Sequence, residues 1–245
     1  MKLLVLGHSD SDGSMLPDPS NGWPWVIQRQ LNALGHDVEI THRMLYAAPT
    51  ASRFVERELA RHSPDIVVVA TSTHGVLFQL TSIRVREVLG ERAGSMVARL
   101  ERFVSTHNGD PESFRGKATL RARRVARKAL RAKSDLTVEE LIRIYSDCFD
   151  VLARAENTQT IILAGVGYTP WVEAQSPGFS GLQGRIAARL KALALEHHFD
   201  WLVHEELLGG PSGKMPYYLD DGVHTNEQSQ QMVADAMLPL VAARL

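Results

Sequence analysis

The chain has 245 residues, and its 27 Lys and Arg against 28 Asp and Glu give a formal net charge of −1 at pH 7. A length of this order suits one α/β domain with a substantial buried core. The near-neutral balance excludes a chain-wide basic field that would recruit nucleic acid or an anionic membrane. The single cysteine, Cys148, excludes an intramolecular disulfide framework.

The predicted elements alternate between short apolar strands and amphipathic helices. Leu3–Leu6 is an uninterrupted apolar run, typical of a strand buried on both faces, and Gly7 ends it. Further strands are predicted over residues 38–40, 66–70, 160–164 and 201–203, and helices over 23–34, 54–60, 184–197 and 232–241. This alternation predicts an α/β fold, a three-layer flavodoxin-like sandwich with a five-stranded parallel sheet and helices on both faces.

Residues 83–135 interrupt this alternation, and we expect them to form a basic helical insertion or cap within a single domain of residues 1–245. Between Arg115 and Lys133 there are nine Lys or Arg and no acidic residue, which indicates a helix with one strongly basic face. Three interpretations stay open. The segment is a solvated helix, a cap that attracts an anionic small-molecule substrate, or a surface for nucleic acid or an anionic membrane, although it lacks the interleaved aromatic side chains that favour the last.

The first motif that points to chemistry is Gly7-His8-Ser9, directly after the first predicted strand. Ligands bind at the carboxyl edge of an open α/β sheet, because the loops there are exposed while the strands beneath hold them in place. Ser9 is therefore a candidate nucleophile. The alternative is that Ser9, Asp10 and Ser11 are turn residues that close the first strand, since Ser and Asp readily bond their own backbone.

The second motif is Asp221-Gly222-Val223-His224, directly before the last predicted helix. Thr225 followed by Gln228 predicts a capping box, so His224 should stand just ahead of the helix. The positive end of the helix dipole favours a neutral imidazole there, which is the form that a general base needs. Asp221 can hydrogen-bond the other ring nitrogen and set the tautomer.

Together these motifs resemble the SGNH/GDSL-type serine hydrolases, a family of esterases and lipases. The first is similar to the family's Gly-Asp-Ser signature with His8 in place of the aspartate, and Asp221 and His224 match its Asp-x-x-His signature. The resemblance implies a catalytic triad of Ser9, Asp221 and His224 that cleaves ester bonds through an acyl-enzyme intermediate. An acyltransferase with the same triad, or a catalytically impaired binding protein on this scaffold, stays open.

A third block concerns the oxyanion hole. After the third predicted strand this sequence has Ser72-Thr73-His74-Gly75 where the family has Gly-x-Asn-Asp. The resemblance implies that the oxyanion is held by the backbone N–H of Ser9, by His74 at the asparagine position, and by the backbone of Ala47 in the loop that carries a glycine in the family. Pro49 in that loop has no N–H to donate. An imidazole N–H can serve as a donor.

Other motifs do not point to a metal or a nucleotide. Gly165-Val166-Gly167 lacks the third glycine of a dinucleotide fingerprint, and the zinc-helix pattern that starts at His204 has Leu208 where the second histidine is required. We therefore expect no metal, no cofactor and a small-molecule ester substrate. Because no run approaches the roughly 18 apolar residues of a membrane span and no leader precedes the first strand, we expect residence in the cytoplasm.

Overall fold

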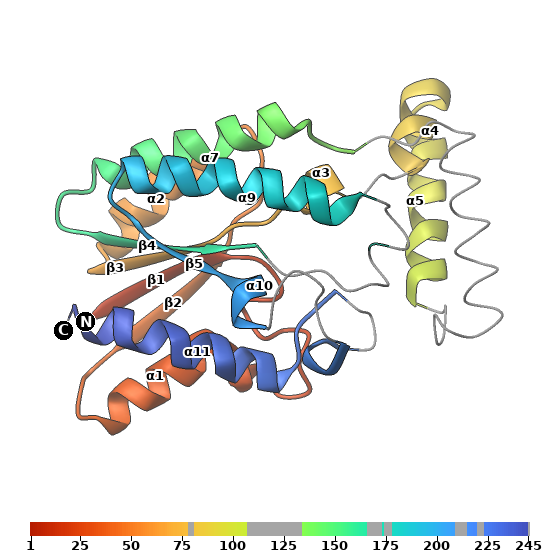
Figure 1. Cartoon of the computed structure of the whole chain (residues 1–245). Helices are drawn as coiled ribbons and strands as arrows, with labels where there is room; N and C mark the ends of the chain where they lie inside the picture. Colours follow the sequence, from red (N-terminus) through yellow and green to blue (C-terminus); the bar gives the residue numbers. More distant parts are fainter. Residues whose placement is uncertain are drawn as a thin grey trace.

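The protein is built around a five-stranded parallel sheet (Figure 1). The computed structural model describes residues 1–77, 81–106, 134–165, 173, 178–208, 215–219 and 223–244. The strands are β1 (Lys2–Gly7), β2 (Glu39–Met44), β3 (Ile66–Ala70), β4 (Gln159–Ala164) and β5 (Asp200–Val203), and they lie side by side in the order β2-β1-β3-β4-β5. All four neighbouring pairs are parallel, and this order is that of flavodoxin-like sheets. The predicted fold class is confirmed.

Helices cover both faces of the sheet (Figure 1). The described helices are α1 (Trp23–Ala33), α2 (Ala51–His62), α3 (His74–Leu77), α4 (Thr81–Leu89), α5 (Glu91–Thr106), α7 (Val138–Ala153), α9 (Phe179–Glu196), α10 (His204–Leu207) and α11 (Glu227–Ala242), with 3-10 turns η1 (Pro19–Asn21) and η2 (Met215–Tyr217). Helices α1 and α11 lie on one face, and α2, α7 and α9 lie on the other. The sandwich therefore has three layers.

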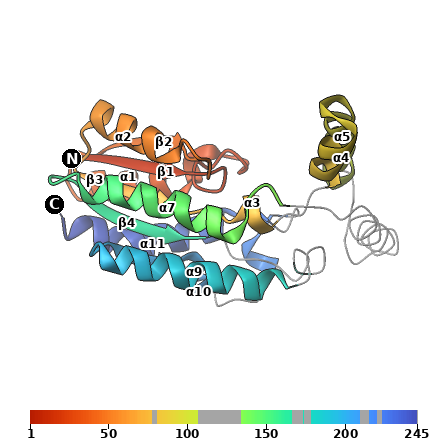
Figure 2. The same ribbon diagram turned by 90° about the horizontal axis from the view of Figure 1, so that it is seen from above.

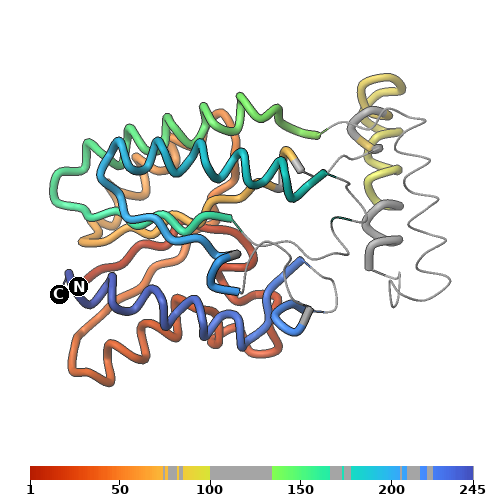
Figure 3. The backbone as a smooth tube through the Cα atoms, in the orientation of Figure 1, coloured from red at the N-terminus to blue at the C-terminus, as the bar shows by residue number. Residues whose placement is uncertain are grey.

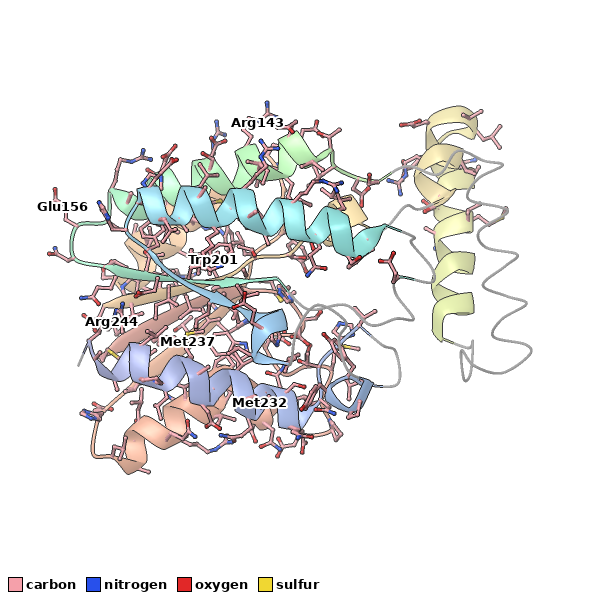
Figure 4. All side chains as sticks on the ribbon, viewed as in Figure 1. Arg143, Glu156, Trp201, Met232, Met237 and Arg244 are labelled. Carbon is pink, nitrogen blue, oxygen red and sulfur yellow. The ribbon has the colours of Figure 1, made fainter. Side chains whose placement is uncertain are left out.

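Alternate residues of β1 supply the two cores. Leu3 and Val5 pack beneath α1 and α11, whereas Leu4 and Leu6 pack beneath α2, α7 and α9. Met237 of α11 is fully buried against the first of these cores (Figure 4). Because both faces of β1 are covered, its sequence has no polar alternation, and each buried aliphatic side chain contributes about 1.5–3 kcal/mol to stability.

Two predicted boundaries differ from the structure. Strand β2 was expected to end at residue 40 but continues to Met44, because it is an edge strand whose polar residues 41–43 still pair with β1. The predicted capping box of Thr225 and Gln228 is wrong. Asn226 is the N-cap of α11, and its Oδ1 accepts a hydrogen bond from Ser229 N at 3.1 Å.

Helices α4 and α5 pack on each other and stand apart from the sandwich, beyond the end of the sheet toward which the strands run (Figures 1 and 2). They expose three large apolar side chains, Val88, Leu89 and Met96. The predicted basic helix of residues 115–133 lies outside the described residues. The assignment of residues 83–135 as one insertion or cap stays a prediction.

The two chain ends lie together at the opposite edge of the sheet (Figure 3). The Arg244 guanidinium, at the end of α11, donates to the Asp200 carboxylate at the start of β5 (Figure 4). The Met1 ammonium donates to Asp37 O at 2.8 Å. None of the described helices is long and apolar enough to cross a membrane.

Helix α7 begins with a complete capping box. Thr137 Oγ1 accepts from Glu140 N at 3.2 Å, and Thr137 N donates to the Glu140 carboxylate at 2.8 Å. We expect Thr137→Ala to lower the free energy of unfolding by about 1 kcal/mol, because an orphan backbone donor loses its acceptor. Urea denaturation measures the loss. Thr137→Ser keeps the hydroxyl and should be nearly neutral, and equal losses in both variants would contradict the capping role.

Candidate active site

The candidate site lies at the carboxyl edge of the sheet, where the strand order reverses. The chain passes from β1 outward to β2 and returns to β3 on the other side of β1. Loops that follow β1 and β3 therefore leave in opposite directions, and such switch points are where ligands bind in open α/β sheets. Ser9 lies in the loop after β1, and His74 begins α3 soon after β3.

Ser9 and His224 meet at this edge. Ser9 Oγ lies 3.0 Å from His224 Nε2, although 215 positions separate the two residues in the chain, and both are partly buried. At that distance a neutral imidazole can take the hydroxyl proton directly. Because Nε2 faces the serine, a carboxylate that orients the ring has to reach Nδ1. Asp221, predicted for this role, lies outside the described residues.

The backbone on both sides of His224 is fixed by pairing with the segment around η2. Leu219 N donates to His224 O at 2.8 Å, and Asn226 N donates to Tyr217 O at 3.1 Å. Tyr218 and Thr225 form an antiparallel bridge. The backbone of His224 thus lies between this short ladder and the capped start of α11, and backbone hydrogen bonds hold it in place.

Ser11 braces the loop that carries Ser9. Its hydroxyl donates to His8 O at 2.7 Å and accepts from His8 N at 2.9 Å, and it also lies 3.0 Å from His42 Nε2. Burial lowers the pKa of His42, the Asp12 charge opposes that shift, and the Arg43 charge adds to it. The two bonds to Ser11 Oγ hold the His8 backbone in a closed turn next to Ser9.

A buried polar cluster lies beside the Ser9–His224 pair and consists of Asp10, Thr225, Gln230, His204 and the backbone N–H of Trp23. Asp10 Oδ1 accepts from both the N–H and the hydroxyl of Thr225, each at 2.7 Å. Gln230 Nε2 donates to Asp10 O at 2.9 Å and to Thr225 Oγ1 at 2.6 Å, and its Oε1 accepts from Trp23 N at 2.9 Å. A buried charge is tolerated only when hydrogen bonds satisfy it in this way.

His204 closes the other side of this cluster. Its Nδ1 lies 3.9 Å from Asp10 Oδ2, its side chain is 2% exposed, and its Nε2 has no hydrogen-bond partner among the described residues. Burial lowers the pKa of His204, and the Asp10 charge opposes the shift. The described residues hold no group of three His, Cys, Asp or Glu side chains placed to bind a metal ion.

The predicted oxyanion residues are only partly described. Among the described residues, none accepts a hydrogen bond from the backbone N–H of Ser9. Ala47 is half-buried and packs against the core beneath α2. The side chain of His74 lies outside the described part of the chain. The Ser72 backbone is bound to a core side chain, because Ser72 N donates to Tyr145 Oη at 2.6 Å.

Sequence reasoning missed three members of the buried polar cluster. The sequence offers Asp10 only as one residue of a possible turn and His204 only as the start of an incomplete zinc pattern, and it does not single out Gln230. A signal for Gln230 was present, because it shares the apolar face of the last helix with Val233 and Met237 at helical spacing. A lone amide on such a face indicates a buried hydrogen-bonding role.

Gly7 is required where β1 turns into the nucleophile loop. A Cβ at this position would lie 2.0 Å from Ser11 Oγ and 2.9 Å from Ser11 Cβ. We expect Gly7→Ala to lower the free energy of unfolding by about 1–3 kcal/mol, because the braced Ser11 has no room to move. Urea denaturation tests this, with Gly184→Ala as the control. A Cβ at Gly184 in α9 meets no atom within 4 Å, so that variant should be stabilised.

The buried His204 should make the fold sensitive to mild acid. Below pH about 6.5 the unfolded chain binds a proton at this histidine while the folded protein, with its lowered pKa, does not. The free energy of unfolding should then fall by up to about 1.4 kcal/mol per pH unit for this group. Urea midpoints at pH 7.5 and 5.5 measure the effect. His204→Gln, which does not titrate, should lose less stability than the wild type, and equal losses would contradict the assignment.

Comparisons with known proteins agree with this geometry at the level of the fold. The sequence matches no family model and no curated protein. Est24, a carbohydrate acetylesterase from Sinorhizobium meliloti, is 14% identical, with 100% of this chain and 99% of that chain covered and a TM-score of 0.58. The esterase EstA from a Pseudoalteromonas species is 14% identical, with 99% and 97% covered and a TM-score of 0.56.

A GDSL-like lipase from Bacteroides thetaiotaomicron is 12% identical, with 100% of this chain and 89% of that chain covered and a TM-score of 0.56. The likeness thus extends over nearly the whole chain in all three cases, while identity is low. The chain therefore shares the SGNH/GDSL-like fold of these three proteins.

Proposed function

We propose that the protein is a carboxylic ester hydrolase in which Ser9 is the nucleophile and His224 the general base. The observation that carries this proposal is the 3.0 Å contact between Ser9 Oγ and His224 Nε2 at the carboxyl edge of the sheet. The fold, which is shared with several esterases, supports it. Because Est24 is a carbohydrate acetylesterase, an acetyl ester is the first substrate to test.

In this mechanism Ser9 Oγ bonds to the ester carbonyl carbon while His224 Nε2 takes the hydroxyl proton. Collapse of the tetrahedral intermediate breaks the bond to the leaving oxygen, and His224 returns the proton to the departing alcohol. Water then attacks the acyl carbon while His224 takes its proton. Collapse of this second tetrahedral intermediate breaks the bond to Ser9 Oγ, and His224 returns the proton to that oxygen, which releases the acid and restores Ser9. We assign Asp221 to the Nδ1 side of the imidazole from its spacing in the sequence, where it stabilises the imidazolium.

The oxyanion that forms in each half-reaction needs hydrogen-bond donors. We assign the backbone N–H of Ser9 as the first donor, and His74 and the backbone of Ala47 as the others. Each donor typically contributes about 2.7–4 kcal/mol of barrier lowering. Pro49 has no N–H, so the loop after β2 offers one donor fewer, and we expect slow turnover. Covalent labelling is therefore a more sensitive readout than hydrolysis.

A fluorophosphonate probe and p-nitrophenyl acetate test the proposal together. The wild type should gain one phosphonyl group on Ser9 Oγ, located by peptide mass spectrometry, and should release p-nitrophenol. Ser9→Ala should lose both signals because no nucleophile remains. Ser14→Ala is the matched control, since Ser14 is an exposed serine of the same loop whose hydrogen bond to Asp12 uses its backbone N–H. That variant should behave as the wild type.

Other outcomes would contradict the proposal. Labelling on Ser11, or unchanged labelling in Ser9→Ala, would move the nucleophile away from Ser9. Absence of labelling and of turnover in the wild type would instead favour the binding-protein alternative. An alcohol acceptor that diverts the acyl group from free acid to a new ester would favour the acyltransferase, because both reactions share the acyl-enzyme intermediate.

A further inference from the structure

One buried carboxylate joins the two loops that meet at the candidate site. Asp10 directly follows Ser9, and Thr225 directly follows His224. Asp10 Oδ1 accepts both the N–H and the hydroxyl proton of Thr225, each at 2.7 Å. The hydrogen bonds between Asp10 and Thr225 therefore connect the residue after the candidate nucleophile to the residue after the candidate base.

Gln230 of α11 binds both Asp10 and Thr225, and we call these three hydrogen-bonded residues the joint. It donates one amide proton to Asp10 O and the other to Thr225 Oγ1, while its Oε1 accepts from Trp23 N at the start of α1. Both donor protons and the acceptor oxygen of this amide are used. With His204 on the far side of Asp10, the cluster draws together the loop after β1, the end of β5 and the starts of α1 and α11.

The polar groups of the joint all point toward one another rather than toward solvent. Asp10 is 5% exposed, and Thr225 and Gln230 are each 1% exposed. Water therefore cannot replace a lost partner without entering the core between β1 and α11. Rotation of either loop away from the other would leave a buried carboxylate and a buried backbone N–H unsatisfied, which strongly favours the closed arrangement.

We propose that Asp10 is a positioning residue, which keeps Ser9 Oγ and His224 Nε2 at hydrogen-bonding distance by fixing the Ser9 loop to the Thr225 backbone. The hydrogen bonds of the Asp10 carboxylate go to Thr225 and not to either of these two atoms. Its effect on rate follows because proton transfer from the hydroxyl to the imidazole depends steeply on their separation. This role rests on the proposed function only in its catalytic consequence, and the geometric claim stands by itself.

Variants of Asp10 can distinguish its role as a hydrogen-bond acceptor from an effect of its negative charge. Asp10→Ala removes the acceptor, whereas Asp10→Asn keeps a carbonyl oxygen that can still accept both Thr225 protons. Thr225→Val is a milder break, because it deletes the hydroxyl and leaves the backbone N–H. Glu58→Gln is the matched control. Glu58 is also a carboxylate with a 2% exposed side chain, but it lies in α2, where its partners are Arg43, Arg57 and His62 and not the loops that carry Ser9 and His224.

For p-nitrophenyl acetate we expect Asp10→Ala to lower kcat by about 10²-fold with KM unchanged, and the rate constant for phosphonylation to fall in parallel. Asp10→Asn should restore most of both, and Thr225→Val should lie between them. Glu58→Gln should keep the wild-type kcat even where its thermal midpoint falls as far as that of Asp10→Ala. Wild-type kcat in folded Asp10→Ala, or an equal loss of kcat in Glu58→Gln, would overturn the proposal.

An NMR measurement separates this proposal from the assignment of an ester hydrolase. In the wild type, Ser9→Ala should shift the imidazole resonances of His224, because the two side chains are hydrogen-bonded. In the Asp10→Ala background the same Ser9→Ala change should leave His224 unshifted, while the Asp10→Asn background should keep the effect. An equal shift in all backgrounds would overturn the positioning role, whether or not the protein cleaves esters.

Discussion

The physical constraint on which the site depends is the burial of one carboxylate between the first and last segments of the chain. Asp10 can remain in the interior only while Thr225 and the chain around it supply its hydrogen bonds. The same hydrogen bonds bring Ser9 and His224 together, because Ser9 directly precedes Asp10 and His224 directly precedes Thr225. Packing of the α11 start on the sandwich and alignment of the candidate nucleophile with its base therefore depend on the same hydrogen bonds.

The sheet was predictable because its strands are covered on both faces. Runs such as Leu3–Leu6 and Ile66–Ala70 are too short for helices and too uniformly apolar for a half-exposed strand, so they indicate a parallel central sheet. The edge strand β2 was predicted too short because part of it is not covered by apolar packing. Its outer residues 41–43 are polar and only half-buried, so backbone pairing with β1 holds them in place and no apolar pattern marks them.

The sequence predicted the two motifs of the candidate site but not the hydrogen bonds that hold them together. Spacing placed Ser9 and His224 at element ends, but it assigned Thr225 to a local cap. Thr225 and Asn226 both satisfy the residue preferences of an N-cap, and only the tertiary partner separates them, because Asp10 takes the Thr225 hydroxyl and leaves the cap to Asn226. Contacts between positions 215 apart leave no periodic trace in one sequence, so the joint itself was invisible there.

A serine hydroxyl at 3.0 Å from an imidazole does not identify a nucleophile, since this loop holds two such pairs. Their hydroxyls differ in how many bonds they already make. The one proton of Ser11 goes to His8 O at 2.7 Å, and its oxygen accepts from His8 N, so His42 Nε2 can only approach as a donor. A histidine that donates cannot act as a base toward that hydroxyl. Ser9 makes no such backbone bond with its hydroxyl among the described residues, and its proton is therefore available to His224.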